Sequence, residues 1–159
     1  MKKIVPFIVC ISLMLIIGCS TTPQVPIPQP TIITNAVPIK YCDSQEILDY
    51  LDLLKSTIDI YTDQLKVADA TSRVALSGPV SQLQETKRSF SDVEAPPCTE
   101  KLHTYFISSM NKFIDYFLAF MASKPDAETE IILNEASQFM DDANSEMSKL
   151  VACMPNCVP

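Results

Sequence analysis

The sequence predicts an all-α domain, an up-down bundle of four helices held together by disulfide bonds. The 159 residues include only two glycines, Gly18 and Gly78, whereas sheets with tight hairpins use more. Apolar residues recur at alternating steps of three and four in long segments, which is the repeat of packed helices. Cysteines stand at the ends of those segments, where bonds between them would join one helix to another.

Residues 1–18 have the layout of an export signal. Two lysines precede the apolar stretch Ile4–Ile17, which is shorter than the roughly 20 residues of a membrane-spanning helix. The stretch leads into Ile16-Ile17-Gly18-Cys19, which resembles the lipobox of bacterial lipoproteins. The resemblance implies that the signal peptide is removed, that the thiol of Cys19 carries diacylglycerol, and that this lipid tethers the protein to a membrane.

The same resemblance implies an extracytoplasmic location. Ser20 follows the cysteine, where aspartate is the usual signal for retention at the inner membrane, so the outer membrane is expected in a two-membraned cell. In a single-membraned cell the anchor would leave the protein on the outer cell surface. Residues 19–40 comprise the lipidated cysteine and a proline-rich linker, which favours an extended polyproline II backbone. Residues 41–159 are expected to form the helical domain.

Four helical segments are expected in that domain. The first starts after Asp43 or Ser44 and ends at Ser77-Gly78-Pro79, with Gly78 as its C-cap. The others cover about 79–91, about 99–123, and Pro125 to Pro155. The alternative is a three-helix bundle in which the first helix continues through a kink at Gly78-Pro79. The apolar seam of the first segment consists of Ile47, Leu51, Leu54, Ile58, Tyr61, Leu65 and Ala68.

Four cysteines remain in the domain once the signal peptide is removed and Cys19 is lipidated, and an even number in an exported domain indicates disulfides. In an up-down bundle the starts of the first and third helices lie at the end where the fourth helix finishes, so all four meet there. Helix neighbours favour Cys98 with Cys153 and Cys42 with Cys157. The other pairing that fits joins Cys42 to Cys98 and Cys153 to Cys157.

Charge and composition argue against several classes of function. The formal net charge is −7, and removal of Lys2 and Lys3 with the signal makes it −9, which argues against nucleic acid as a partner. His103 is the only histidine, so the Glu100–His103 pair cannot be doubled as in a di-iron bundle. A single glycine in the mature chain leaves no phosphate-binding loop. We therefore expect no enzyme, no cofactor and no metal site.

The third segment is more apolar than one buried face requires. Its excess predicts either a helix enclosed by its neighbours or an exposed binding patch that includes Tyr105, Tyr116, Phe117 and Leu118. We expect a membrane-tethered interaction or structural module of the cell envelope, with an envelope or extracellular protein as its partner. The alternative function is a sensor or carrier that takes an apolar ligand or a metal ion between its helices.

Overall fold

A computed structural model describes residues 42–154, 156 and 157. The predicted signal peptide, the lipobox with Cys19 and the proline-rich linker lie outside the described residues. Pro155, where the last helix was expected to end, lies outside them as well.

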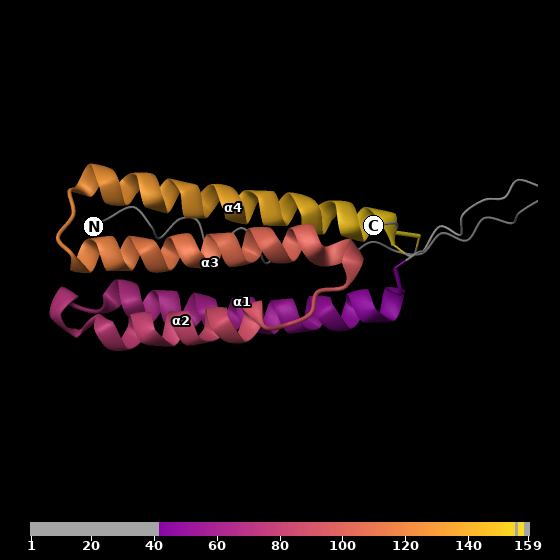
Figure 1. The fold of residues 1–159 in the computed structure, drawn as a ribbon, viewed down its shortest axis with the longest axis horizontal. Helices are drawn as coiled ribbons and strands as arrows, with labels where there is room; N and C mark the ends of the chain where they lie inside the picture. The colour runs from indigo at the N-terminus through magenta and orange to yellow at the C-terminus, as the bar shows by residue number, and fades with distance from the viewer. Residues whose placement is uncertain (1–41, 155, 158–159) are drawn as a thin grey trace, which may run out of the picture. The chain divides into compact units, whose positions relative to one another are not determined.

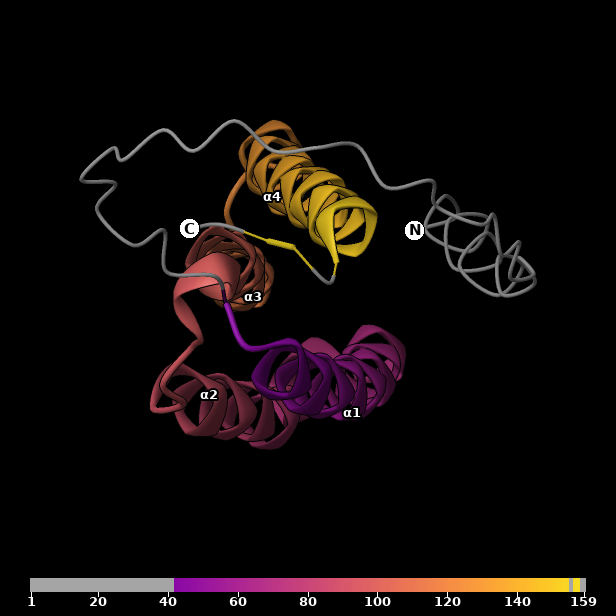
Figure 2. The same ribbon diagram turned by 90° about the vertical axis from the view of Figure 1, so that its right-hand side faces the viewer.

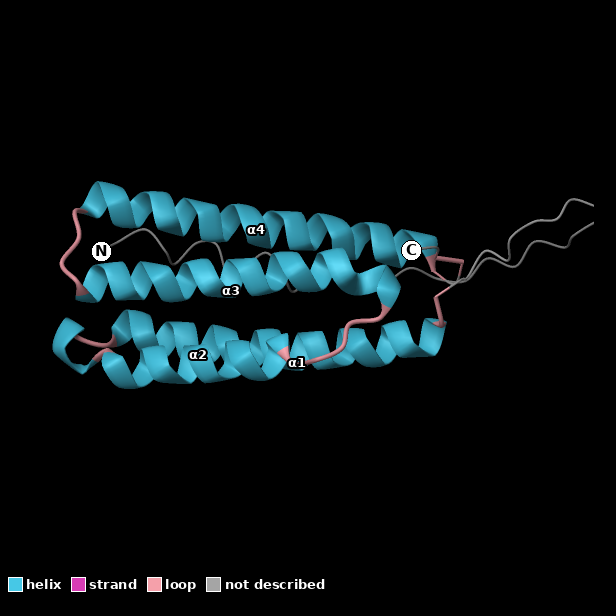
Figure 3. Ribbon diagram, viewed as in Figure 1, coloured by secondary structure: helices cyan, strands magenta, loops and turns pink. Residues whose placement is uncertain are grey.

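Four α-helices make up most of the described residues, among which there is no β-strand (Figure 3). The prediction of an all-α domain with four helices is therefore confirmed. The helices are α1 (Ser44–Ala70), α2 (Ser77–Ser91), α3 (Glu100–Met121) and α4 (Asp126–Cys153). Two short 3₁₀ turns, η2 (Arg73–Ala75) and η3 (Pro97–Thr99), lie in the connections.

The start of α1 follows from its capping residue. The side chain of Asp43 accepts hydrogen bonds from the backbone N–H groups of Gln45, at 2.7 Å, and Glu46, at 3.2 Å. These bonds satisfy two of the donors that the first turn of a helix leaves without an intrahelical partner. The local sequence therefore decides where α1 begins.

The end of α1 differs from the prediction, because the helix finishes at Ala70. Thr71 is extended, with φ −92° and ψ 136°, and Leu76 in the following turn is fully buried in the core. Gly78 is not a C-cap, since it lies in the first turn of α2 and has no positive φ. A residue before proline normally avoids the helical conformation because its Cβ clashes with the proline Cδ. Gly78 has no Cβ, so it can be helical immediately before Pro79.

α1 and α2 are thus separate helices that pack against each other (Figure 1). The alternative of a single first helix kinked at Gly78-Pro79 is wrong. Seen from the end, α1 and α2 lie side by side, and α3 and α4 form a second pair (Figure 2). The contact between α3 and α4 is the most extensive of all, and α2 also packs against α3.

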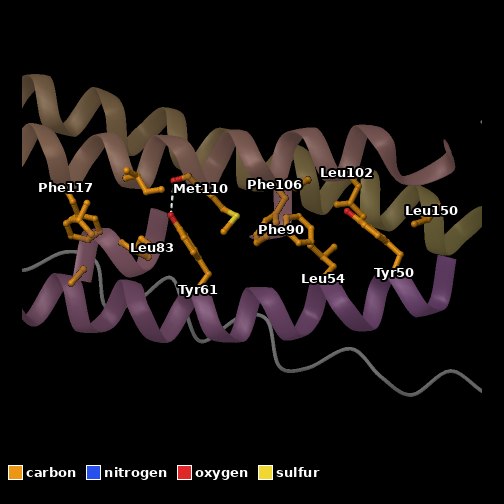
Figure 4. Packing of buried hydrophobic residues seen from close by; sticks show 14 of the residues in the cluster. Tyr50, Leu54, Tyr61, Leu83, Phe90, Leu102, Phe106, Met110, Phe117 and Leu150 are labelled. Atoms are coloured by element: carbon orange, nitrogen blue, oxygen red, sulfur yellow. Dashed lines mark hydrogen bonds between the residues drawn. The ribbon is translucent and has the colours of Figure 1, made fainter. Parts of the chain in front are cut away.

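The core lies between the two pairs (Figure 4). Its largest side chains come from three helices, and Tyr61, Leu83 and Phe106 are each 2 % exposed or less. Phe90 of α2 meets Phe106 edge-on, with ring centroids 5.3 Å apart. The predicted seam of α1 is buried or partly buried throughout its length.

Small side chains bring α3 and α4 close together. Ser109 and Ala136 are fully buried and Ala143 is 4 % exposed. The hydroxyl of Ser109 donates to the backbone carbonyl of Ala136 at 2.9 Å. Lys112 and Glu135 form an ion pair across the edge of the same contact, with 2.6 Å between nitrogen and oxygen. Because the distance between helices depends on the side chains at their contact, these residues explain the tight packing.

The disulfides are Cys42–Cys98, with Cα atoms 6.1 Å apart, and Cys153–Cys157, with Cα atoms 4.9 Å apart. The pairing of Cys98 with Cys153 and of Cys42 with Cys157 is therefore wrong. A tight turn after α4, in which Asn156 N–H donates to the Cys153 carbonyl, brings Cys157 back to its neighbour. Cys42 N–H donates to the Cys157 carbonyl at 3.1 Å, so the four cysteines do gather in one place.

Candidate protein-binding surface

α1 carries a second line of apolar side chains besides its buried seam. Leu53, Ile60 and Val67 are 42 %, 51 % and 53 % exposed. They follow one another at intervals of seven residues, which returns each side chain to nearly the same face of a helix. We call these three residues the outer stripe. α1 therefore presents one apolar face to the core and another to solvent.

A groove of about 530 Å³ lies between α1 and α2, beside two of the three residues of the outer stripe. Leu53 and Ile60 line it from α1, and Phe90 and Val93 add apolar surface from the end of α2 and just beyond it. The polar residues of its lining are Thr57, Gln64, Gln82, Glu85, Thr86 and Ser89. The groove thus combines apolar anchoring points with groups that can donate and accept hydrogen bonds.

A hydrogen bond ties the two walls of the groove together. The hydroxyl of Thr86 on α2 donates to the side-chain oxygen of Gln64 on α1, at 2.9 Å. Because this bond crosses from one helix to the other, it holds α1 at a defined distance from α2. The shape of the groove therefore depends on how α1 and α2 pack against each other.

Two tyrosines determine which face of α1 turns outward. Tyr61 is buried, and its hydroxyl donates to the backbone carbonyl of Met110 on α3 at 2.8 Å (Figure 4). The hydroxyl of Tyr50, two turns from the start of α1, is hydrogen-bonded to His103 Nδ1 at 3.0 Å. Both bonds point α1 toward α3, and burial raises the pKa of both tyrosines well above its usual range. The outer stripe consequently faces solvent.

His103 lies in the contact between α1 and α3. Its ring packs against Phe90, with centroids 4.8 Å apart, and burial lowers its pKa from the usual value. Within the described part of the chain no three His, Cys, Asp or Glu side chains gather as metal ligands would. The geometry therefore gives His103 a packing role between α1, α2 and α3.

The patch predicted on the third helix is divided among different environments. Phe117 is in the core and is 5 % exposed, and its ring meets Tyr116 at a centroid distance of 5.1 Å. Tyr105 and Tyr116 are partly buried, whereas Leu118 is 42 % exposed. Leu118 is two residues from Tyr116 and so lies on the far side of the helix. The structure does not gather these four residues on one exposed surface.

Comparison with protein-family models, with curated proteins and with solved structures gives no match to this chain. None of the helices in residues 42–154 has the combination of length and apolar character that crossing a membrane demands.

Sequence reasoning missed the outer stripe because it assigned α1 a single seam. The signal was present in the sequence, since Leu53, Ile60 and Val67 repeat at the same interval as the seam residues Leu54, Tyr61 and Ala68. The excess of apolar residues drew attention to the third helix, where most of them are buried or partly buried. On α1 the fold leaves three apolar residues outside the seam exposed, namely Leu53, Ile60 and Val67.

Proposed function

We propose that this chain is a lipid-anchored, extracytoplasmic helical module of the cell envelope, which binds another protein through the outer stripe and the adjoining groove. The observation that carries the proposal is the alignment of three large apolar side chains, 42–53 % exposed, beside a groove lined by two helices. Single exposed apolar residues are ordinary on a monomer, whereas three on one face of a helix beside a groove offer a partner repeated anchoring points.

The fold that goes with this function is an up-down four-helix bundle closed by disulfides. Figure 1 supports it, because the ribbon reverses direction at each connection between α1 and α4. The gathering of the cysteines also supports it, since Cys42, Cys98 and Cys157 are joined by a disulfide and a backbone hydrogen bond.

The anchor is tested separately from the binding surface. Cells that express the full chain or the Cys19→Ala variant are fed a fatty acid that carries an alkyne tag. We expect the tag on the full chain and its absence from the variant. Equal labelling of the two chains would contradict lipidation at Cys19.

The binding surface is tested by photo-crosslinking in intact cells. A photoreactive amino acid replaces Ile60 in the outer stripe or, as a matched control, Ile131 on α4, which is 59 % exposed. We expect a discrete adduct with another protein from position 60 and none from position 131. The same adducts from both positions, or none from position 60, would contradict binding through the outer stripe.

A further inference from the structure

We infer that the outer stripe and its groove receive a basic amphipathic α-helix of the partner protein. The inference rests on the proposed function and specifies the chemistry of the partner. The spacing of the apolar anchors and the charges around them carry it.

The spacing fits a helix laid along α1. Leu53, Ile60 and Val67 recur every seven residues, and the span from the first to the third is about 21 Å of helix axis. One core position of a second helix repeats at the same interval, so such a helix can place an apolar side chain beside each member of the stripe. A groove between two helices beside such a line of anchors is the usual receptor for an amphipathic helix.

Three acidic residues lie beside the stripe, one of which, Asp63, is paired with Lys66, while the opposite helix α2 also carries Lys87 and Arg88. Asp49 and Asp63 each precede a member of the stripe by four residues and therefore lie one turn away on the same face. Glu85 stands in the opposite wall of the groove. α1 as a whole has six acidic residues and two lysines.

Both lysines of α1 already pair with aspartates of the same helix. Lys55 is 3.1 Å from Asp59, and Lys66 is 2.8 Å from Asp63. These exposed pairs leave the helix with an excess of negative charge. A partner helix with lysine or arginine beside its apolar face would complement that charge, and such complementarity raises association rates and selects the partner.

The same charges disfavour two other occupants. A second copy of the chain would bring α1 against α1, and its excess of carboxylates would face another excess of carboxylates. A membrane surface with anionic headgroups would be repelled for the same reason. The experiments below distinguish a second copy and a membrane surface from a basic helix.

The test measures binding of two designed helical peptides to the full chain in detergent. Each peptide has roughly 18 residues and leucines in a heptad seam, one with lysine and one with glutamate at the flanking positions. We expect the basic peptide to bind at least about tenfold more tightly than the acidic one, and its affinity to fall as the ionic strength rises. Equal binding of the two peptides, or no binding of the basic one, would overturn the inference.

Matched variants locate the site. Ile60→Asp and Glu85→Lys should each weaken binding of the basic peptide by about tenfold, whereas Ile131→Asp and Glu130→Lys on α4 should change it by less than about twofold. Circular dichroism checks that all four variants are folded. Equal effects of the groove variants and the α4 variants would show general attraction to an acidic protein and would overturn the inference.

Two further outcomes assign the surface to another occupant. A dimer in sedimentation that is lost on Ile60→Asp would mean that a second copy covers the stripe. Binding to vesicles of neutral lipid that is lost on the same substitution, tested with the Cys19→Ala variant, would mean a membrane. A crosslink in cells from position 60 to a partner segment without basic residues would refute the inference and leave the proposed function intact.

Discussion

The two helix pairs of this protein meet through different kinds of side chain. α3 and α4 meet through small buried residues, among them Ser109, Ala136 and Ala143, and share the most extensive helix contact. α1 and α2 leave a groove of about 530 Å³ between them, edged by Ile60, which is 51 % exposed. α3 and α4 also leave exposed apolar residues such as Ile131 and a smaller groove of about 330 Å³, so the difference between the pairs lies in the small residues of the buried α3–α4 contact.

This difference separates stability from the proposed binding. Small residues between α3 and α4 leave no room for larger ones, so substitution there should destabilise the fold. Side chains of the outer stripe contact solvent on one side, so their replacement should affect a partner more than the fold. The following predictions test that separation, from the largest expected effect on stability to the smallest.

Ala136→Leu should lower the free energy of unfolding by about 3 kcal/mol, because a larger side chain at a fully buried position forces α3 and α4 apart. Urea denaturation with the disulfides intact measures the change. Ala127→Leu, at an exposed position of the same helix, is the control and should be nearly neutral. Similar losses from the two variants would show that the contact between α3 and α4 is not tightly packed.

Tyr61→Phe should lower the free energy of unfolding by about 1 kcal/mol, because it removes the buried hydrogen bond to the Met110 carbonyl and keeps the ring. Tyr116→Phe serves as the control, since that side chain is only partly buried. The two losses are compared in one denaturation series. A neutral Tyr61→Phe would contradict the role of this bond in orienting α1.

Acidification should weaken the contact between α1 and α3. Burial lowers the pKa of His103 in the folded protein, so the unfolded chain binds a proton more readily as the pH falls below about 6.5. His103 therefore favours folding above that pH, and its contribution declines as the pH falls toward the folded-state pKa. The free energy of unfolding of His103→Gln should decrease less than that of the parent chain over this pH window, because glutamine does not titrate. The carboxylates are the same in both proteins, so their contribution cancels in the comparison. Equal decreases would contradict the prediction.

Ile60→Ser should change the free energy of unfolding by no more than about 0.5 kcal/mol, because the side chain is 51 % exposed and its loss leaves no cavity in the core. The crosslinking and peptide experiments should nevertheless respond to substitution at this position. A loss of stability as large as that of Ala136→Leu would show that the outer stripe belongs to the structural core.

Much of the fold could be predicted because its signals are local. Asp43 caps α1 through its own side chain, and the seams of α2, α3 and α4 follow the helical repeat. The end of α1 could not be predicted in this way. α1 ends at Ala70, six residues before Leu76, which is fully buried in a core that helices distant in the sequence build.

The candidate site shows the same limit. The sequence alone contained two apolar lines on α1, but periodicity cannot say which of two neighbouring faces will be buried. Contacts to α3 decided it, since Tyr61 reaches the Met110 carbonyl and Tyr50 reaches His103.

The sequence by itself determined the helical class, because composition, periodicity and caps act within a few residues, and it left open whether the helices number four or three. Only the tertiary structure decided the pairing of Cys42 with Cys98, because a disulfide requires Cα atoms within about 7 Å, whatever their separation along the chain. It also decided that Leu53, Ile60 and Val67 face solvent, because the rotation of a helix about its axis is determined by its neighbours.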